Sequence, residues 1–420
     1  MRALPISLLL PTLAVAAAGC SCATSSTPTD AAAPDAPTVD GATDAARPDA
    51  SAPDAGSSDA GSDANAMDAL GPCLTDPTPD DRTRYVVVAN PFEGDDGRYE
   101  VVRLSDRGVL GPRTGVFTMR KAFEGEIAFS SDGRIGVAAQ DDGTLGIFAL
   151  SDQGTATVID AAYDGTAYAG RVVADPADPR VFWVLDSETR DNGAGVYRLA
   201  LDCHGGVIDE TRAIAADLPY GLGFEASGDA IVVARAMGES GVRGDDVYRV
   251  DLATASVLGS ADVFPDDEWI VAGFALGESH VFFGDNSAFS SVANRLGAAA
   301  LSPIGFAQNG PAVDDPVALL LSPFGDHLLV VDGFGNALFD VPYDASAAMP
   351  LGAPVELTYN GPRPQLPGGA VMITRGSLTG LGLVSENVAI RVVRFRAGML
   401  TDLGPFSLEG AIAGAIGVQP

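Results

Sequence analysis

The stretch Gly125–Ser151 decides the fold and reads Gly-Glu-Ile-Ala-Phe-Ser-Ser-Asp-Gly-Arg-Ile-Gly-Val-Ala-Ala-Gln-Asp-Asp-Gly-Thr-Leu-Gly-Ile-Phe-Ala-Leu-Ser. Its Ser-Asp-Gly and Asp-Asp-Gly tripeptides favour tight turns, because Gly tolerates positive φ and Asp can hydrogen-bond to its own turn. With the residues that follow, it predicts one four-stranded antiparallel sheet. The expected strands are Ile127–Phe129, Arg134–Ala139, Thr144–Leu150 and Thr155–Ile159.

A turn of this kind recurs along the chain at intervals of roughly 45–53 residues. The recurring turns start near Ser131, Pro176, Ala226, Leu276, Pro323 and Gly376. An apolar strand is expected after each, at Ile135–Ala139, Val181–Leu185, Ala230–Ala234, Val281–Phe283, His327–Val331 and Gly380–Val384. A period of this length with four strands in each repeat predicts the blades of a β-propeller.

The two ends of the repeat region complement each other. The segment starting at Arg84 supplies a second strand, a third at Tyr99–Leu104 and a fourth at Arg113–Phe117, but no first strand. The segment Ala415–Pro420 resembles the first strand of a repeat, and we therefore expect it to complete that blade. This predicts an all-β, seven-bladed propeller closed by one C-terminal and three N-terminal strands, which leaves no open sheet edge. A pair of irregular β-sandwiches is the alternative.

Residues 84–420 resemble the broad superfamily of seven-bladed propellers with degenerate blades, such as the WD40-like and lactonase-like groups. The resemblance rests on patterns such as Leu-Ser-Pro-Phe-Gly-Asp-His-Leu-Leu-Val-Val-Asp at 321–332. WD40 repeats carry Trp-Asp pairs, whereas neither Trp183 nor Trp269 precedes Asp. The subfamily therefore stays open.

Residues 1–19 resemble a bacterial lipoprotein signal peptide. Met1-Arg2 is a basic start, Leu4–Ala16 is apolar, and Ala17-Ala18-Gly19 places small residues before Cys20. The resemblance implies cleavage before Cys20 and its lipidation, and Ser21 favours the outer membrane. Ala17 departs from the Leu usual in that family, and an ordinary secretory signal is the alternative. The apolar run is too short to cross a bilayer.

Residues 20–83 are rich in Ala, Asp, Pro and Ser. This composition cannot bury enough apolar surface to offset chain entropy, so the sequence predicts a disordered tether between the lipid and the propeller.

The formal net charge is −31, and Lys121 is the single lysine. This balance argues against nucleic acid, whose phosphates require Lys and Arg contacts. It is compatible with protein partners, a cationic ligand on a propeller face or divalent metal, and equally with simple solubility.

Four cysteines occur, and Cys20 is assigned to lipid. The tether reaches the first blade on the face that also carries the turn containing Cys203. In an oxidising compartment a disulfide between Cys73 and Cys203 is therefore expected.

Polar residues end most of the predicted second strands and define a candidate ligand or metal rim at one mouth of the channel. They are Asn90, Gln140, Asp186, Asp285, Asp332 and Glu386, with Arg235 at the equivalent place in the remaining repeat. Converging carboxylates would suit Ca²⁺, which prefers oxygen ligands. The alternative is a solvated rim without a ligand. His280 and His327 occupy equivalent turn positions in neighbouring repeats, so they are not expected to form a catalytic or metal-binding pair.

No catalytic motif stands out, and the main functional hypothesis is a binding or scaffold module displayed by a lipid-anchored envelope protein. Two alternatives stay open: a metal-dependent hydrolase of the lactonase-like kind that uses channel carboxylates, and a purely structural envelope component.

Overall fold

The computed structural model describes residues 83–90, 96–122, 127–186, 193–216, 219–234, 247–261, 271–285, 295–408 and 414–420. Side chains at 234, 285 and 306–309 are not described. The predicted signal peptide and tether lie outside these residues, as does Arg235. Within the described part, no helix is both long and apolar enough to span a bilayer.

The described residues form seven four-stranded antiparallel sheets, which we number as blades in chain order. Blade 1 contains β28 (Ile416–Val418), β1 (Arg84–Asn90), β2 (Gly97–Leu104) and β3 (Leu110–Met119); blade 2 contains β4 (Ile127–Phe129), β5 (Ile135–Ala139), β6 (Leu145–Leu150) and β7 (Ala156–Tyr163); and blade 3 contains β8 (Ala169–Ala174), β9 (Val181–Asp186), β10 (Gly195–Leu201) and β11 (Val207–Ala215).

The remaining blades have the same four-strand pattern. Blade 4 contains β12 (Pro219–Phe224), β13 (Asp229–Ala234), β14 (Val247–Asp251) and β15 (Ser256–Ala261); blade 5 contains β16 (Val271–Leu276), β17 (His280–Asp285), β18 (Arg295–Leu301) and β19 (Ile304–Ala312); blade 6 contains β20 (Pro316–Leu321), β21 (His327–Asp332), β22 (Ala337–Pro342) and β23 (Val355–Glu356); and blade 7 contains β24 (Ala370–Ile373), the 3₁₀ turn η2 (Gly376–Leu378), β25 (Leu381–Glu386), β26 (Ala389–Arg396) and β27 (Met399–Ser407).

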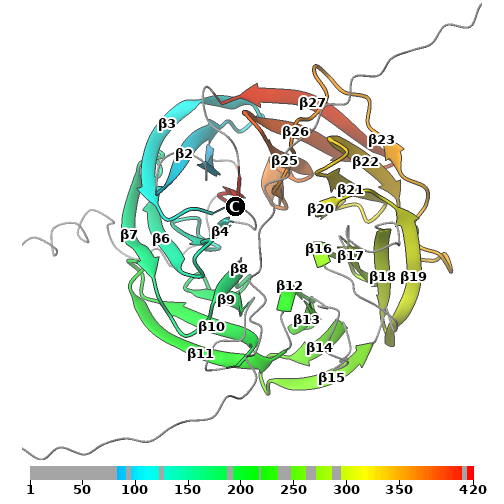
Figure 1. Ribbon diagram of the computed structural model, residues 1–420, viewed down its shortest axis with the longest axis horizontal. Coiled ribbons are helices and arrows are strands. Elements are labelled where there is room, and N and C mark those ends of the chain that lie inside the picture. Colours follow the sequence, from blue (N-terminus) through cyan, green and yellow to red (C-terminus); the bar gives the residue numbers. More distant parts are fainter. Residues whose placement is uncertain are drawn as a thin grey trace, which may run out of the picture. The chain divides into compact units, whose positions relative to one another are not determined.

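The blades stand side by side in a ring, with their first strands inside and their fourth strands outside (Figure 1). Because the strands of a blade alternate in direction, the ring has two distinct faces. We call the face with the connections from second to third strands and between blades face A. The face with the first-to-second and third-to-fourth turns is face B. The predicted fold class and the count of seven blades are confirmed.

The template turns take the conformation that the sequence predicts. Gly133 and Gly143 have φ of 72° and 80°, values that favour glycine. In the first turn, Asp132 Oδ1 accepts a hydrogen bond from the Arg134 N–H at 3.0 Å. The fourth strand runs to Tyr163 instead of Ile159, and its register with β6 shifts twice along this length, as at β-bulges.

The core is divided among the seven junctions between blades. The described buried side chains form seven hydrophobic clusters, each made by two neighbouring blades. In β1, Val86 and Val88 pack toward blade 7, whereas Tyr85, Val87 and Ala89 pack toward blade 2. A strand between two blades is therefore buried on both faces, which explains its continuous apolar sequence.

The ring closes as the sequence predicts. β28 is the innermost strand of blade 1 and pairs antiparallel with β1, with Val86 opposite Val418 and Val88 opposite Ile416. Gly417 also allows a close approach to blade 2, because a Cβ atom there would lie 2.1 Å from the Ile127 carbonyl oxygen. The prediction that Ala411–Pro420 closes the ring is thus confirmed for β28. Residues 411–413 lie outside the described part.

Cys203 lies in the face B turn between β10 and β11 and forms a disulfide. The other three cysteines lie outside the described residues, so the pairing with Cys73 stays a prediction.

We predict that deletion of Ala411–Pro420 strongly destabilises the propeller. The deletion removes buried Ile416 and Val418 and exposes Val86 and Val88. Burial of three or four apolar side chains contributes on the order of 6–10 kcal/mol, comparable to the stability of a whole domain. Thermal denaturation should show a loss of the folding transition or aggregation. Deletion of Ser21–Asn65 is the control and should leave the melting temperature unchanged. An unchanged melting temperature after the C-terminal deletion would contradict the closure.

Candidate functional site

The predicted rim residues lie at the face A ends of second strands but are not solvent-exposed side chains. Asn90, Gln140, Asp186, Asp332 and Glu386 are all buried. Asp285 ends β17, and its side chain is outside the description.

Several of these side chains bind their own blade or the connection beside it. Gln140 Oε1 accepts a hydrogen bond from Thr144 Oγ1 at 2.6 Å, and its Nε2 donates to the Ala161 carbonyl at 3.1 Å. Asp332 Oδ1 accepts from the Gly335 N–H at 2.8 Å. These polar ends therefore organise the connections that follow them. Among the described residues, no three His, Cys, Asp or Glu side chains lie close enough together to hold a metal ion.

The histidines of neighbouring blades make separate contacts. His280 and His327 are the first residues of β17 and β21, the equivalent positions that the sequence predicts. His280 Nδ1 lies 3.0 Å from the Tyr343 hydroxyl, and burial lowers the pKa of the imidazole. His327 Nδ1 lies 2.7 Å from Asp340 Oδ1.

Face A carries a pocket of about 550 Å³ at the junction of blades 6 and 7, which we call the Asn336 pocket. Three segments line it: the β21–β22 turn, the connection from β23 to β24, and the β25–β26 turn. The lining residues are Gly335, Asn336, Pro362, Arg363, Pro364, Gln365, Leu366 and Asn387. The pocket lies beside Asp332 and Glu386, the strand ends of those two blades.

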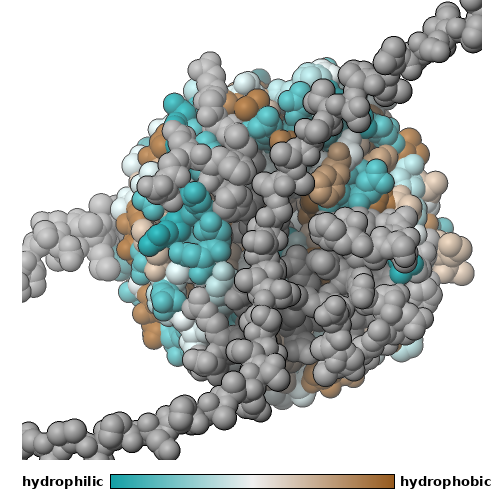
Figure 2. Space-filling model, viewed as in Figure 1, coloured by the Kyte–Doolittle hydropathy of each residue, from teal (hydrophilic) through white to brown (hydrophobic). Residues whose placement is uncertain are grey.

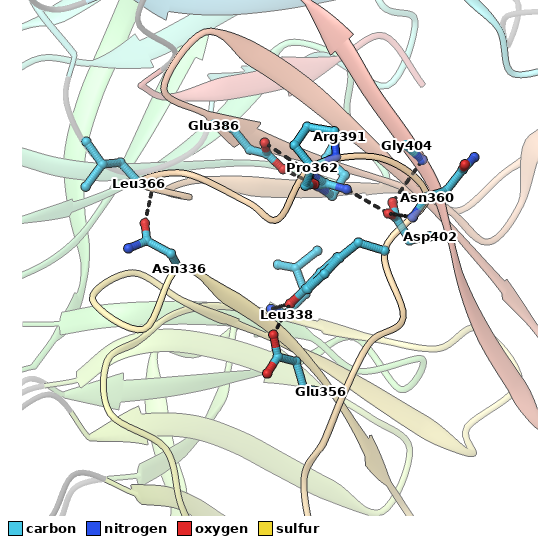
Figure 3. A network of polar contacts seen from close by, with 11 residues as sticks. Asn336, Leu338, Glu356, Asn360, Pro362, Leu366, Glu386, Arg391, Asp402 and Gly404 are labelled. Carbon is cyan, nitrogen blue, oxygen red and sulfur yellow. Dashed lines mark hydrogen bonds and ion pairs between the residues drawn. The ribbon is translucent and has the colours of Figure 1, made fainter. Parts of the chain in front are cut away.

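The connection 357–369 forms much of the pocket and is bonded to blade 6. The Leu366 N–H donates to Asn336 Oδ1 at 2.6 Å (Figure 3). The Leu338 N–H donates to the Tyr359 hydroxyl at 2.9 Å, and that hydroxyl donates to Glu356 Oε1 at 3.0 Å. The connection is therefore bonded to the β21–β22 turn at Leu366 and to β22 and β23 at Tyr359.

Blade 7 holds the same connection through the buried guanidinium of Arg391. Its Nη2 donates to the Pro362 carbonyl at 2.6 Å, and its Nη1 to Asp402 Oδ2 at 2.7 Å (Figure 3). Asp402 Oδ2 also accepts from the Asn360 N–H at 2.8 Å. In addition, Nε of Arg391 donates to Glu386. Arg391 thus links two carboxylates of its own blade to the backbone of the pocket wall.

The charges of this cluster are almost fully removed from water. Arg391 is fully buried, and both Glu386 and Asp402 are buried with it. Burial raises the pKa of Glu386, while the hydrogen bonds and positive charge of Arg391 act in the opposite direction. Such a group depends on its pairing, because an isolated charge in the same place would be very costly.

An exposed aromatic residue directly precedes two of the lining residues, on a turn with a hydrogen-bonded backbone. Phe334 is 74% exposed, although its N–H donates to Asp315 Oδ2 at 3.1 Å. Leu366 and Val388 are exposed as well. The other exposed large hydrophobic residues of the described chain lie on fourth strands or in face B connections. In the region where β22 and β25 lie in Figure 1, hydrophobic and hydrophilic surfaces adjoin (Figure 2).

Sequence reasoning found Asp332 and Glu386 but missed the pocket that they border. Its lining comes from three separate segments, and the longest, 357–369, has no regular periodicity. One sequence signal could have pointed to this site. Glu386 ends β25, and the opposite charge of Arg391 and a second carboxylate, Asp402, follow on β26 and β27.

Comparison with known proteins supports the fold. No family model and no curated protein matches the sequence. Among solved structures, the chain is similar to a putative 6-phosphogluconolactonase from Bacteroides fragilis, with 12% identity, a TM-score of 0.54, and coverage of 82% of this chain and 99% of that one. A periplasmic gluconolactonase from Pseudomonas aeruginosa gives 13% identity, a TM-score of 0.55, and coverage of 80% and 99%. At these identities the likeness shows the propeller fold alone.

We predict that Arg391→Met destabilises the propeller by about 3–5 kcal/mol, the usual cost of leaving buried charges without their partner. Urea denaturation measures the loss, and hydrogen exchange should show faster exchange of the Asn360 N–H. Arg396→Met, at the exposed end of the same strand, is the matched control and should change stability by less than about 0.5 kcal/mol. Equal effects of the two substitutions would refute the role of Arg391.

We predict that the stability change caused by Asp332→Asn depends on pH. Burial raises the pKa of Asp332. A carboxyl group with a raised pKa contributes stability at low pH and loses it as the pH rises through that pKa. The variant cannot ionise, so it should gain stability relative to the wild type as the pH rises from the ordinary value of 3.8 through the raised pKa of Asp332. Urea denaturation across this range measures the trend.

Asp344→Asn is the control for this experiment. Asp344 is exposed, and hydrogen bonds from Ser346 lower its pKa, so Asp344→Asn should show the opposite sign and lose stability relative to the wild type as the pH rises toward 3.8. A pH-independent difference for Asp332→Asn would contradict the prediction.

Proposed function

We propose that this chain is an exported, lipid-anchored protein of the bacterial envelope whose propeller is a binding module. The Asn336 pocket on face A would be its ligand-binding site. The observation that carries the proposal is a pocket wall without regular structure that is nevertheless fixed to both blades. Buried Arg391 donates to the Pro362 carbonyl, and the half-buried Asn336 side chain accepts from the Leu366 N–H.

A binding role fits the surroundings of the pocket. Ligand sites are usually concave, largely preformed, and lined by apolar groups with a few oriented polar ones. The Asn336 pocket combines prolines and Leu366 with amide side chains, and exposed Phe334 directly precedes its lining residues Gly335 and Asn336 in the chain. The anchor part of the proposal rests on the signal-like sequence before Cys20. An acidic head also favours a neutral or cationic partner over nucleic acid.

A second candidate is a lactonase-like hydrolase, because the similar structures from Bacteroides fragilis and Pseudomonas aeruginosa bear lactonase names. The described part of face A favours binding instead. The contacts of Gln140, Asp332 and Glu386 there hold the blade or its connections in place and do not gather around a common centre. A purely structural envelope component remains the third alternative.

Cross-linking in intact cells tests both parts of the proposal. A photoreactive phenylalanine analogue replaces Phe334 on face A or, as the matched control, Phe324, which is 51% exposed on a face B turn. The protein should sediment with outer membranes, and the analogue at 334 should form discrete cross-links that the one at 324 does not form. In the Cys20→Ser background the protein should be unprocessed or soluble, whereas Cys22→Ser should behave as the wild type.

Two results would overturn the proposal. Equal cross-linking from positions 334 and 324 would remove the assignment of face A as the binding face. Membrane association of a Cys20→Ser protein whose signal has been cleaved would remove the lipid anchor.

A further inference from the structure

We propose that the Asn336 pocket binds an uncharged, polyhydroxylated ligand, namely a sugar unit of a neutral saccharide. This inference rests on the proposed binding function and names the class of ligand. Three properties of the pocket support it: two amide side chains without hydrogen-bond partners, compensated charge, and an exposed aromatic residue on a rigid turn.

The first property is the pair of side-chain amides contributed by Gln365 and Asn387. Their backbones are joined, since the Asn387 N–H donates to the Gln365 carbonyl at 2.8 Å. Within the described part of the chain, neither side-chain amide has a hydrogen-bond partner. Each offers two donor hydrogens and one acceptor oxygen. Neighbouring hydroxyl groups of a sugar present the same mixture of donors and acceptors, and both amides belong to residues that line the pocket.

The second property is the balance of charge. Arg363 is the one charged lining residue, and its Nη2 lies 2.9 Å from Glu356 Oε1. An anionic ligand would have to compete with Glu356 for this guanidinium, next to the buried carboxyl groups of Asp332 and Glu386. A cationic ligand would meet Arg363 itself. A neutral ligand avoids both costs and can still accept hydrogen bonds from the guanidinium.

The third property is the exposed aromatic residue that adjoins two lining residues in the chain. Phe334 precedes the lining residues Gly335 and Asn336, and its turn is fixed by Asp315 Oδ2 and Asp332 Oδ1. An exposed aromatic residue on a rigid backbone provides contact area at a low entropic cost. The C–H groups on one face of a sugar ring pack well against such a ring. A pocket of about 550 Å³ lies within the usual range for small-ligand sites.

A binding experiment with immobilised oligosaccharides tests the ligand class. The full chain is solubilised in a detergent without a sugar headgroup and applied to neutral glucose, galactose, mannose and N-acetylglucosamine oligomers. Uronic acid oligomers and glucosamine oligomers are the anionic and cationic comparisons. We expect binding to at least one neutral series and at least tenfold weaker binding to its charged counterparts.

Substitutions locate the binding to the pocket. Gln365→Ala and Asn387→Ala should each raise the Kd for the neutral saccharide about tenfold. This corresponds to a loss of about 1.4 kcal/mol of hydrogen bonding. Phe334→Ala should also raise this Kd. The matched controls are Gln153→Ala and Phe324→Ala in face B turns, which should leave Kd unchanged.

The outcomes separate this inference from the proposed function. Preferential binding of a charged series overturns the neutral ligand class and leaves the binding module in place. If no series binds while cross-linking specific to face A is retained, the saccharide ligand class is overturned and the binding module is kept. Neutral saccharide binding that survives Gln365→Ala and Asn387→Ala shows that the ligand occupies another site and overturns the assignment of the pocket.

Discussion

Every blade of this protein needs a neighbour on both of its faces. The side chains of β1 show the constraint, because alternate residues enter the clusters with blade 7 and with blade 2. A blade at the end of an open row would expose one complete apolar face to water. Pairing of β28 with β1 removes that exposure and places the seventh cluster between the last and the first blade.

The same constraint determines where a binding site can form. The sheet faces are occupied by packing, so variation is confined to the connections between strands. At the junction of blades 6 and 7, the short β23 leaves a long connection to β24, and Arg391 holds this connection by its backbone. A buried ion cluster often contributes little net stability compared with apolar packing. Here it fixes one carbonyl of an irregular segment, and the pocket depends on that position.

The fold was predictable from sequence because its signals are local and repeated. Ser-Asp-Gly and Asp-Asp-Gly specify turns through the backbone freedom of Gly133 and Gly143. The missing first strand of blade 1 could be recognised only because the other blades supplied a template. The candidate site was less predictable. The strand-end position of Glu386 followed from the repeat, but its burial depends on Arg391 one strand later and Asp402 beyond that. Amide residues such as Gln365 and Asn387 carry no sequence signature, and their proximity arises only from the folded connection.

Ring closure also has a topological consequence. Gln419 and Tyr85 are joined by a backbone hydrogen bond of 3.0 Å, at the point where the first hairpin of each other blade turns. A short peptide bridge there would convert the head into a cyclic polypeptide without changing the order of any strand. The seven blades would then have no first or last member, and the backbone could be reopened at another face B hairpin. In such circular permutants the same contacts would be present, while a different sheet would combine strands from both ends and become the place where unfolding can begin.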